Sequence, residues 1–377
     1  MSGSAAPRVL LVGAAGYGST YVEEIARLEA AGEVELAGIC DRSAPVGAAA
    51  DLLGDRPWAD DLGQLLVKTS PDVVVVATPI PLHLPMARQV LGADARLLLE
   101  KPPTATLADW RALCAHPGPA ARQVGFQSLG SSAVPRLRAL VESGALGQVR
   151  HVGVRGAWQR TDSYYARAAW AGRRTLDGVP VADGVWTNPF AHGLATALAV
   201  LGTTRAEDVT DVRTQLWRTR DIECDDTAWV RVETTAGVPV VGAATLCADE
   251  DEEPAVVVAG TGGTAVLHYT ADVLEVDGTV ETHTRTSPLQ DLLRHADEPQ
   301  RLQSSLADCG AFMQVLEALR LAPPVPRVPE EAVRDVGVGR SVGQGGTDRL
   351  RTLPGITAVV RRVAQEGLTL EAAGRPW

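Results

Sequence analysis

Short apolar runs alternate with amphipathic stretches through the first third of the chain. The run Asp72–Ala77 is mostly valine, a composition typical of a parallel strand that is covered on both faces. The stretch Ser19–Ala31 places Val22, Ile25 and Leu28 on one face of a predicted helix. This βαβ succession predicts a doubly wound parallel sheet. The other strands are expected at Val9–Val12, Glu33–Cys40, Arg96–Leu99 and Arg122–Phe126, and the other helices at Leu84–Leu91 and Leu107–Ala115.

Beyond residue 128 the apolar and polar positions alternate in longer segments that are separated by short turns, which predicts a largely antiparallel sheet. Its strands are expected at Val149–Gln159, Val209–Arg218, Thr227–Thr234, Val238–Cys247, Ala255–Val258 and Thr264–Tyr269. Helices are expected at Ala133–Ser143, Ala191–Leu201, Leu302–Leu321 and Ile356–Glu366. The acidic run Asp249–Glu253 falls between two of the strands and is interpreted as a solvated turn.

The fold class that these patterns predict is α/β, in two domains. A doubly wound parallel sheet is expected at residues 1–127, and an α/β domain with a largely antiparallel open sheet at residues 128–377. The sequence leaves open whether the C-terminal helix packs back on the first domain.

Charge and composition narrow the range of functions. The net charge of −11 argues against a nucleic-acid or anionic-membrane partner, because binding a polyanion needs a basic surface. No apolar run approaches the roughly 20 residues that span a bilayer. The five cysteines form no C-x-x-C pair and the histidines show no metal-ligand spacing, so we expect free thiols in a reducing cytoplasm and no metal site.

A glycine-rich turn follows the first predicted strand. Gly13, Ala15 and Gly18 occupy the three positions of a G-x-G-x-x-G pattern, with alanine in place of the middle glycine. Such a turn between a strand and a helix presents backbone N–H groups to a dinucleotide pyrophosphate. The expected cofactor contacts in the turn are Gly13, Ala15, Gly16, Tyr17 and Gly18.

The second predicted strand ends at Asp41. A carboxylate there can accept hydrogen bonds from both ribose hydroxyls of NAD and would repel a 2′-phosphate. Arg42 follows directly, and a guanidinium can hold that phosphate. We therefore expect NAD as the cofactor and keep NADP as an alternative.

Four local patterns together resemble the glucose–fructose oxidoreductase and inositol dehydrogenase family, Gfo/Idh/MocA. They are Gly13–Gly18 with Asp41, Ala77-Thr78-Pro79 with His83, Glu100-Lys101-Pro102 after an apolar run, and Asn188-x-x-x-His192. The resemblance implies a Rossmann domain followed by an α/β domain whose open sheet often forms an oligomer interface. It also implies that Thr78, Pro79, His83 and Glu100 lie at the cofactor, that Lys101 lies near the nicotinamide and the substrate hydroxyl, and that the Lys101–Pro102 bond is cis.

The chemistry that this resemblance implies is oxidation of a secondary alcohol. His192 is a candidate base because the ordinary pKa of an imidazole is about 6.5. Lys101 could stabilise the alkoxide as a cation or act as the base itself, and the residues leave both roles open. Asn188 lies four residues before His192, so a helix would put both on one face. Family members often carry aspartate at this position, and asparagine cannot relay a proton.

Aromatic and arginine residues are concentrated in residues 158–190, just before His192. Flat aromatic faces and forked polar groups are typical of sugar sites, so we interpret the stretch as a substrate pocket or its lid. A packed loop or a subunit interface is the alternative. The expected substrate contacts are Trp158, Tyr164, Tyr165, Arg167, Trp170, Asn188 and His192.

These observations favour an NAD(P)-dependent oxidoreductase acting on a secondary alcohol or ketone of a sugar, cyclitol or sugar derivative. Two alternatives remain: a redox-neutral NAD-dependent glycosidase or epimerase on the same fold, and a catalytically silent dinucleotide-binding regulator. We expect a cytoplasmic homodimer or homotetramer with a small sugar-like substrate.

Overall fold

The structure, a computed structural model, describes residues 5–181, 183–340 and 347–377. The chain forms two compact units. The first consists of Met1–Thr104, Ala108–Phe126 and Thr286–Ala307, and the second of Ala105–Leu107, Gln127–Arg285 and Asp308–Trp377. Among the described residues, no helix is both long and apolar enough to cross a membrane.

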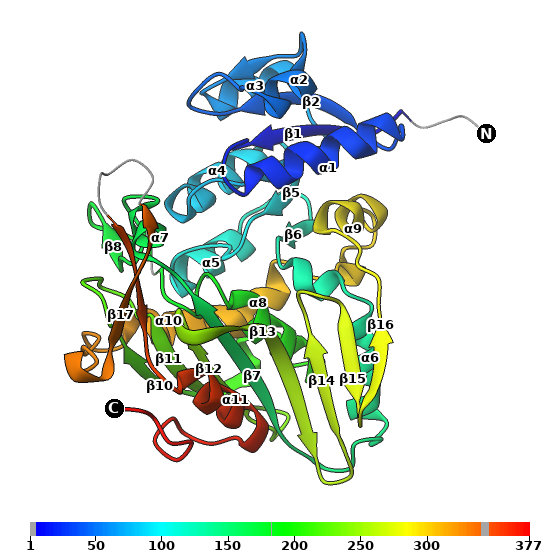
Figure 1. The fold of residues 1–377 in the computed structure, drawn as a ribbon. Helices are drawn as coiled ribbons and strands as arrows, with labels where there is room; N and C mark the ends of the chain where they lie inside the picture. The colour runs from blue at the N-terminus through cyan, green and yellow to red at the C-terminus, as the bar shows by residue number, and fades with distance from the viewer. Residues whose placement is uncertain (1–4, 182, 341–346) are drawn as a thin grey trace. The chain divides into compact units, whose positions relative to one another are not determined.

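The first unit contains a parallel sheet, drawn in blue and cyan in Figure 1, with the strand order β3-β2-β1-β4-β5-β6. This is the order of a doubly wound dinucleotide-binding sheet, in which ligands bind outside the carboxyl ends of the strands where the order reverses. The prediction of a doubly wound sheet is confirmed. The strands are β1 (Arg8–Val12), β2 (Glu35–Cys40), β3 (Trp58–Ala59), β4 (Val73–Val76), β5 (Arg96–Leu99) and β6 (Arg122–Val124).

The core of the first unit lies where helices cover this sheet. Val22, Ile25 and Leu28, the apolar stripe expected of the first helix, are buried against strand residues such as Val9 and Leu36. The helices are α1 (Gly18–Ala30), α2 (Ala48–Leu53), α3 (Leu62–Thr69), α4 (His83–Gly92), α5 (Leu107–Cys114) and α9 (Pro288–Arg294), with 3-10 turns η1 (Ile80–Leu82) and η4 (Pro299–Arg301).

A late segment, Thr286–Ala307, belongs to the first unit. Val124 N donates to Ser304 O at 2.8 Å and Leu306 N donates to Arg122 O at 2.8 Å, so the segment extends the sheet beyond β6. The expected helix Leu302–Leu321 is therefore too long. Its first residues use their backbone groups to pair with β6, and the helix itself, α10, begins only at Gly310.

The second unit contains a mixed, mostly antiparallel sheet with the order β10-β11-β12-β7-β13-β14-β15-β16, in which β12 and β7 run parallel. The strands are β7 (Val149–Gln159), β10 (Val209–Trp217), β11 (Thr227–Thr234), β12 (Val240–Thr245), β13 (Cys247–Gly260), β14 (Thr264–His268), β15 (Val273–Val276) and β16 (Thr279–Thr282). Two small hairpins pair β8 (Thr175–Leu176) with β9 (Val179–Pro180) and β17 (Arg334–Arg340) with β18 (Thr347–Thr352).

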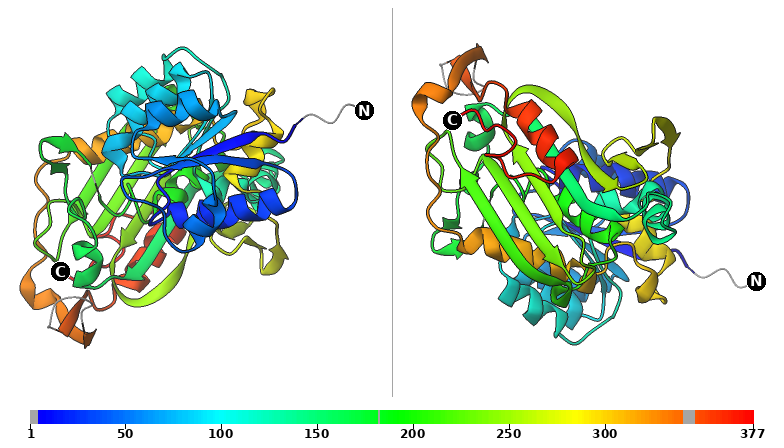
Figure 2. Two further views of the ribbon diagram at one scale, coloured as in Figure 1. Left: turned by 90° about the horizontal axis from the view of Figure 1, so that it is seen from above. Right: turned by 90° about the horizontal axis from the view of Figure 1, so that it is seen from below.

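Helices lie on both faces of this sheet. Successive residues of a strand face opposite sides. On β12, Val241 and Ala243 pack with the C-terminal helix α11, whereas a Cβ at Gly242 would lie 3.0 Å from the ring of Trp186. Figure 2 shows α11, in red, lying across the strands. The helices are α6 (Ala133–Glu142), α7 (Asp162–Ala166), α8 (Ala191–Val200), α10 (Gly310–Leu321) and α11 (Ile356–Glu366), with 3-10 turns η2 (Gln127–Gly130), η3 (Ala206–Asp208), η5 (Ala307–Cys309) and η6 (Glu330–Ala332).

The C-terminal helix thus packs in its own unit, on one face of the second sheet. Trp217 and Trp229 are buried beneath the segment that carries α11, together with Val360 and Val363 of the helix.

The interpretation of Asp249–Glu253 as a solvated turn is wrong. These residues lie within β13, where the pairing with β7 is interrupted by register shifts. Their oxygens bind neighbouring groups instead of water alone: Asp249 accepts hydrogen bonds from the backbone of Gly355 and Thr357, each at 3.0 Å. The acidic run is a strand whose carboxylates have partners, which charge alone does not indicate.

Candidate functional site

The predicted cofactor residues follow the carboxyl ends of four strands that are neighbours in the first sheet. Gly13 follows β1, Asp41 follows β2, Ala77 follows β4 and Glu100 follows β5, and the order of these strands is β2-β1-β4-β5. Parallel strands bring their carboxyl ends to one edge of a sheet. Three of the four sequence patterns, those of the first unit, therefore meet at that edge.

The glycine turn is tightly packed at two of its three pattern positions. A Cβ at Gly13 would lie 2.5 Å from the carbonyl oxygen of Ala77, and Gly13 has a φ of +85°. A Cβ at Gly18 would lie 2.0 Å from the carbonyl oxygen of Gly13. Ala15, the position that departs from the pattern, is exposed together with Gly16 and Tyr17. The turn and the start of α1 therefore form the cradle that a dinucleotide pyrophosphate requires.

Asp41 lies directly beside this turn. Its Oδ2 accepts a hydrogen bond from Ala14 N at 2.9 Å, and its carbonyl oxygen accepts one from Trp58 Nε1 at 3.2 Å. The carboxylate is thereby held at the cradle from the neighbouring strand, where it can meet a ribose. Arg42 is exposed.

His83 is fully buried and links two of the predicted cofactor loops. Its Nδ1 lies 2.9 Å from Pro102 O and its Nε2 lies 2.8 Å from Thr78 O. Burial lowers the pKa of His83 and the nearby Lys101 charge acts in the same direction, while the carbonyl contacts oppose them. A neutral imidazole donates a hydrogen bond through only one of its two nitrogens. Because the buried ring contacts a carbonyl oxygen on each side, it serves as a brace between the Thr78–Pro79 turn and the loop of Lys101.

Glu100 is buried and holds the backbone at Lys101. Its Oε1 accepts a hydrogen bond from Tyr21 Oη at 2.6 Å, and its Oε2 accepts one from Lys101 N at 3.1 Å. Burial, together with the Glu100 charge, raises the pKa of Tyr21 well above its usual value. The Lys101–Pro102 bond is cis, which confirms the expectation. Sequence reasoning missed Tyr21, because a tyrosine on an amphipathic helix gives no sign of the carboxylate that it meets.

One compositional signal at Lys101 was also missed. Lys68 and Lys101 are the only lysines among the 35 lysine and arginine residues of the sequence. Lys68 is exposed at the end of α3. A chain that uses arginine almost everywhere keeps a lysine at the carboxyl end of β5, and a lysine amine can change its protonation where a guanidinium does not.

In the second unit, Asn188 and His192 lie at the start of α8. Asn188 precedes the helix and His192 is its second residue, and Ser128 Oγ donates to the carbonyl oxygen of His192 at 3.4 Å. The Asn188 side chain donates through Nδ2 to Asp183 Oδ1 at 2.7 Å. Asp183 was missed in the sequence, where it lies five residues before Asn188 in a mainly apolar stretch.

The aromatic residues of the predicted substrate segment stack on arginines and on one another. The Arg160 guanidinium lies 4.7 Å from the Trp158 ring, and the Arg167 guanidinium lies 3.7 Å from the Tyr164 ring and 4.7 Å from that of Trp170. Trp158 in turn lies 4.5 Å from Phe190, between Asn188 and His192 in the sequence. The aromatic and arginine side chains that indicated a pocket thus form a continuous stack that reaches the start of α8.

Tyr165 differs from its neighbours because its hydroxyl is buried in the unit. The Arg220 guanidinium lies 5.1 Å from its ring, and Arg220 Nη1 also donates to Cys247 Sγ at 3.3 Å. Burial raises the pKa of Tyr165 well above its usual value and that of Cys247 to about 12. These contacts hold the Tyr165 ring on Arg220 and enclose its hydroxyl in the unit.

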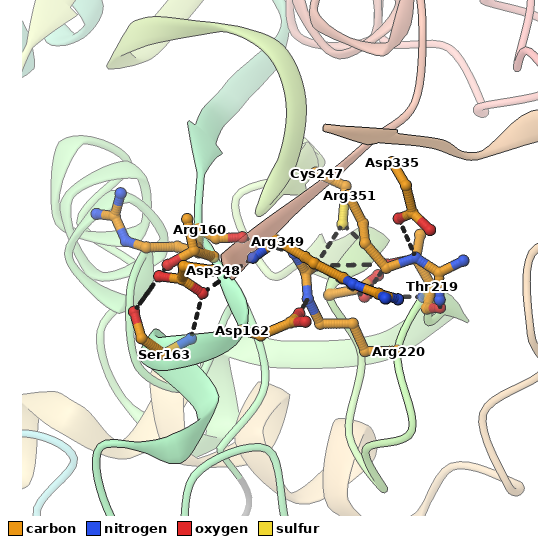
Figure 3. Close-up of polar contacts among 12 residues, drawn as sticks. Arg160, Asp162, Ser163, Thr219, Arg220, Cys247, Asp335, Asp348, Arg349 and Arg351 are labelled. Carbon is orange, nitrogen blue, oxygen red and sulfur yellow. Dashed lines mark hydrogen bonds and ion pairs between the residues drawn. The ribbon is translucent and has the colours of Figure 1, made fainter. Parts of the chain in front are cut away.

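Two polar contacts anchor the short helix α7 of this segment (Figure 3). Asp162 accepts a hydrogen bond from Arg220 Nε at 3.0 Å, and Ser163 donates to Asp348 through its hydroxyl at 2.6 Å and its backbone N–H at 3.1 Å. The segment is therefore held against β18 on one side and against the buried Arg220 on the other.

Two family models match most of the chain. The model for the oxidoreductase family with an NAD-binding Rossmann fold, GFO_IDH_MocA, matches residues 7–125, and the model for the GFO/IDH/MocA C-terminal domain matches residues 134–266. The chain is also 30% identical over 168 residues to D-glucoside 3-dehydrogenase of Escherichia coli (strain K12). That match covers 43% of this chain and 42% of the relative, so the chain spans less than half the relative's length.

Solved structures share the fold over most of the chain. The WlbA dehydrogenase from Bordetella pertussis, in complex with NADH and UDP-GlcNAcA, has a TM-score of 0.67 and 22% identity over 83% of this chain and 95% of that one. Levoglucosan dehydrogenase in complex with NADH has a TM-score of 0.66 and 17% identity over the same shares. With both family models matched in their order along the sequence, the chain belongs to the Gfo/Idh/MocA family of oxidoreductases, and its first unit is an NAD-binding Rossmann domain.

Proposed function

We propose that this oxidoreductase transfers a hydride between NAD and a secondary alcohol or ketone of a sugar, cyclitol or sugar derivative. The observation that carries the proposal is Lys101, one of two lysines in the chain, at the same sheet edge as the glycine turn and Asp41. NAD, when bound, supplies the hydride acceptor at its nicotinamide ring. The chain supplies the binding, orientation and proton handling.

Within this proposal the protein residues divide the work on one substrate hydroxyl. Lys101 stabilises the negative charge that develops on the substrate oxygen as its proton is lost, before the departing hydride leaves a neutral carbonyl. His192 takes the hydroxyl proton in oxidation and returns it in reduction. Glu100 and His83 hold the loop that carries Lys101, through Lys101 N and Pro102 O.

Asp41 supports NAD over NADP in this proposal. Its carboxylate lies at the glycine turn, where it would accept the ribose hydroxyls and repel a 2′-phosphate. The exposed Arg42 is the residue that would favour NADP. Titrating the protein with NADH and with NADPH decides between them.

Two observations support a sugar-like substrate. The family relatives named above include a D-glucoside dehydrogenase and a levoglucosan dehydrogenase. Trp158, Tyr164 and Trp170, which stack on Arg160 and Arg167, are flat side chains of the kind that pack on the C–H surfaces of a sugar. We keep these three residues, with Asn188 and His192, as the proposed substrate contacts.

The proposal also keeps a cytoplasmic homodimer or homotetramer. All five cysteines are free thiols, which supports a reducing compartment.

The test is a screen of sugars, cyclitols and their acids for NAD reduction, followed by Lys101→Ala on the best substrate. We expect the variant to lose about 100-fold or more in kcat, the range seen when one charge-stabilising group is removed from an active site. Lys68→Ala is the matched control because it removes the other lysine, and we expect it to keep full activity. Full turnover by the Lys101 variant would refute the assigned role.

A further inference from the structure

Asp183 is a carboxylate buried at the start of the Asn188 segment. Its side chain is 2% exposed and accepts hydrogen bonds from three groups: Asn188 Nδ2 at 2.7 Å, Gly172 N at 2.8 Å, and Arg167 Nη2 at 3.1 Å to one oxygen and 3.4 Å to the other. A buried charge persists only where it is paired and hydrogen-bonded. Arg167 pairs with this one, and the groups around Asp183 all donate hydrogen bonds to it.

The chemistry of this contact determines which way the Asn188 amide faces. A carboxylate offers acceptors only, whereas an amide has a donating NH2 on one branch and an accepting oxygen on the other. An amide oxygen 2.7 Å from a carboxylate oxygen would be repelled. The group on Asp183 must therefore be Nδ2, and Oδ1 faces the opposite way.

Asn188 has a further property in the sequence. It is the only asparagine among the 377 residues. Aspartates such as Asp249 and Asp291 accept hydrogen bonds from backbone N–H groups, which need no donor on the side chain. Position 188 instead donates to a buried carboxylate, which an amide can do and a carboxylate cannot.

We propose that Asp183 is a positioning residue that locks the Asn188 amide, so that Oδ1 is the acceptor presented to the substrate hydroxyl. The inference deepens the proposed function and rests on it for the identity of that hydroxyl. A neutral amide oxygen can accept the hydroxyl hydrogen bond but cannot take the proton. Asn188 therefore orients the alcohol, and the proton leaves to another base.

The same contacts give Arg167 a different task from the one expected. Its guanidinium is stacked between Tyr164 and Trp170 and donates to Asp183. Arg167 thus acts on Asn188 through Asp183, and the aromatic rings hold it there. We accordingly do not keep Arg167 among the direct substrate contacts.

A single asparagine allows a direct spectroscopic test on the full-length protein. Protein labelled with ¹⁵N in the asparagine side-chain amide gives one pair of proton signals, from Asn188. If Asp183 fixes the orientation of the amide, we expect two well-separated signals that exchange slowly with solvent, one of them shifted downfield by the carboxylate. A pair of near-degenerate, rapidly exchanging signals overturns the inference, whatever the enzyme's activity.

Alanine variants then assign the lock to Asp183. We expect Asp183→Ala to bring the two signals together and speed their exchange. Asp162→Ala is the matched control, because it removes another aspartate of the same segment, one that binds Arg220, and adds no asparagine. Unchanged signals in a folded Asp183→Ala, or equal changes in both variants, contradict the assignment.

An exchange of the two side chains separates positioning from mere packing. Asn188→Asp alone places two carboxylates in contact, and we expect kcat to fall about tenfold or more, as when a charged hydrogen-bond partner is lost. Combining it with Asp183→Asn restores a donor–acceptor pair with reversed polarity and leaves an acceptor oxygen at position 188. We expect the double variant to recover at least about tenfold of the lost kcat, with KM for NAD unchanged throughout.

The two readouts fail in different ways. If no sugar is oxidised, the proposed function fails while the amide signals still decide the lock. A double variant no more active than Asn188→Asp, in protein that binds NADH normally, overturns the positioning role and leaves the proposed function standing.

Discussion

Asp225 illustrates at the scale of one residue how the fold alters a carboxyl group. It is fully buried, and burial raises its pKa to about 6, to which the neighbouring Asp226 contributes. A hydrogen bond from Val185 N at 2.9 Å and the charge of Arg174 oppose this rise without cancelling it. The group therefore favours the protonated form in the folded state. It contributes stability below the unfolded pKa, and that stability is lost as pH rises through about 6.

Asp225→Asn keeps the shape of the side chain and removes its titration. We expect the free energy of unfolding of the variant, relative to the natural protein, to rise by about 2 kcal/mol between about pH 4 and pH 7, because only the natural protein must ionise a buried acid. Urea unfolding across this range measures the difference. Asp297→Asn, at a side chain that is 93% exposed, is the control. Its difference in unfolding free energy from the natural protein should not change with pH. A difference that falls with rising pH would contradict the assignment.

Asp249 determines, at the scale of elements, where α11 begins. The strand β13 reaches the N-terminus of this helix, and Asp249 accepts hydrogen bonds from the backbone N–H groups of Gly355 and Thr357. Burial alone would raise the pKa of Asp249, but these hydrogen bonds outweigh it and lower that pKa. The carboxylate supplied by a strand thus does the work that a capping residue does within a helix.

Asp249→Ala leaves those two N–H groups without their acceptor. We expect it to lower the free energy of unfolding by about 1–2 kcal/mol at neutral pH, the range for a lost helix cap. Because the folded pKa lies below the unfolded one, the deficit should shrink as pH falls below about 4. Denaturant unfolding at several pH values measures it, and Glu250→Ala, an exposed neighbour in the same run, is the control. Equal losses in both variants would show that general charge, not capping, is responsible.

At the scale of the whole molecule, the C-terminal segment covers one face of the second sheet and so removes that face from the surface available for association. Trp217, Trp229 and Val241 on the second sheet are buried with α11 and the residues that follow it, and Trp377 lies 5.5 Å from Trp217. The C-terminal segment thus covers this face of the second sheet within the chain itself.

A chain that ends at Leu353 lacks this cover. We expect it to self-associate, because removing α11 exposes a contiguous apolar surface that includes two tryptophans. Size-exclusion chromatography with light scattering compares it with the full chain, and Arg362→Ala, which changes only the exposed face of α11, is the control. A shortened chain with the mass of the full-length assembly would contradict this prediction.

The sequence by itself determined the features that depend on neighbouring residues. The valine run of β4, the apolar stripe of α1 and the glycine turn each follow from local spacing, and the motifs they carry lie at strand ends because parallel strands share an edge. For the same reason Lys101 and Asp41 could be placed at one edge of the sheet from the sequence.

Only the tertiary structure decided which polar groups meet across long distances in the chain. The backbone of Ser304 and Leu306 pairs with β6 instead of extending a helix, and Asp249 of the acidic run binds the backbone at the start of α11. The positioning role inferred for Asp183 likewise follows from its contact with Asn188, which the sequence does not show. A side chain's chemistry shows what it can bind, but its partner depends on burial and packing, which no local pattern records.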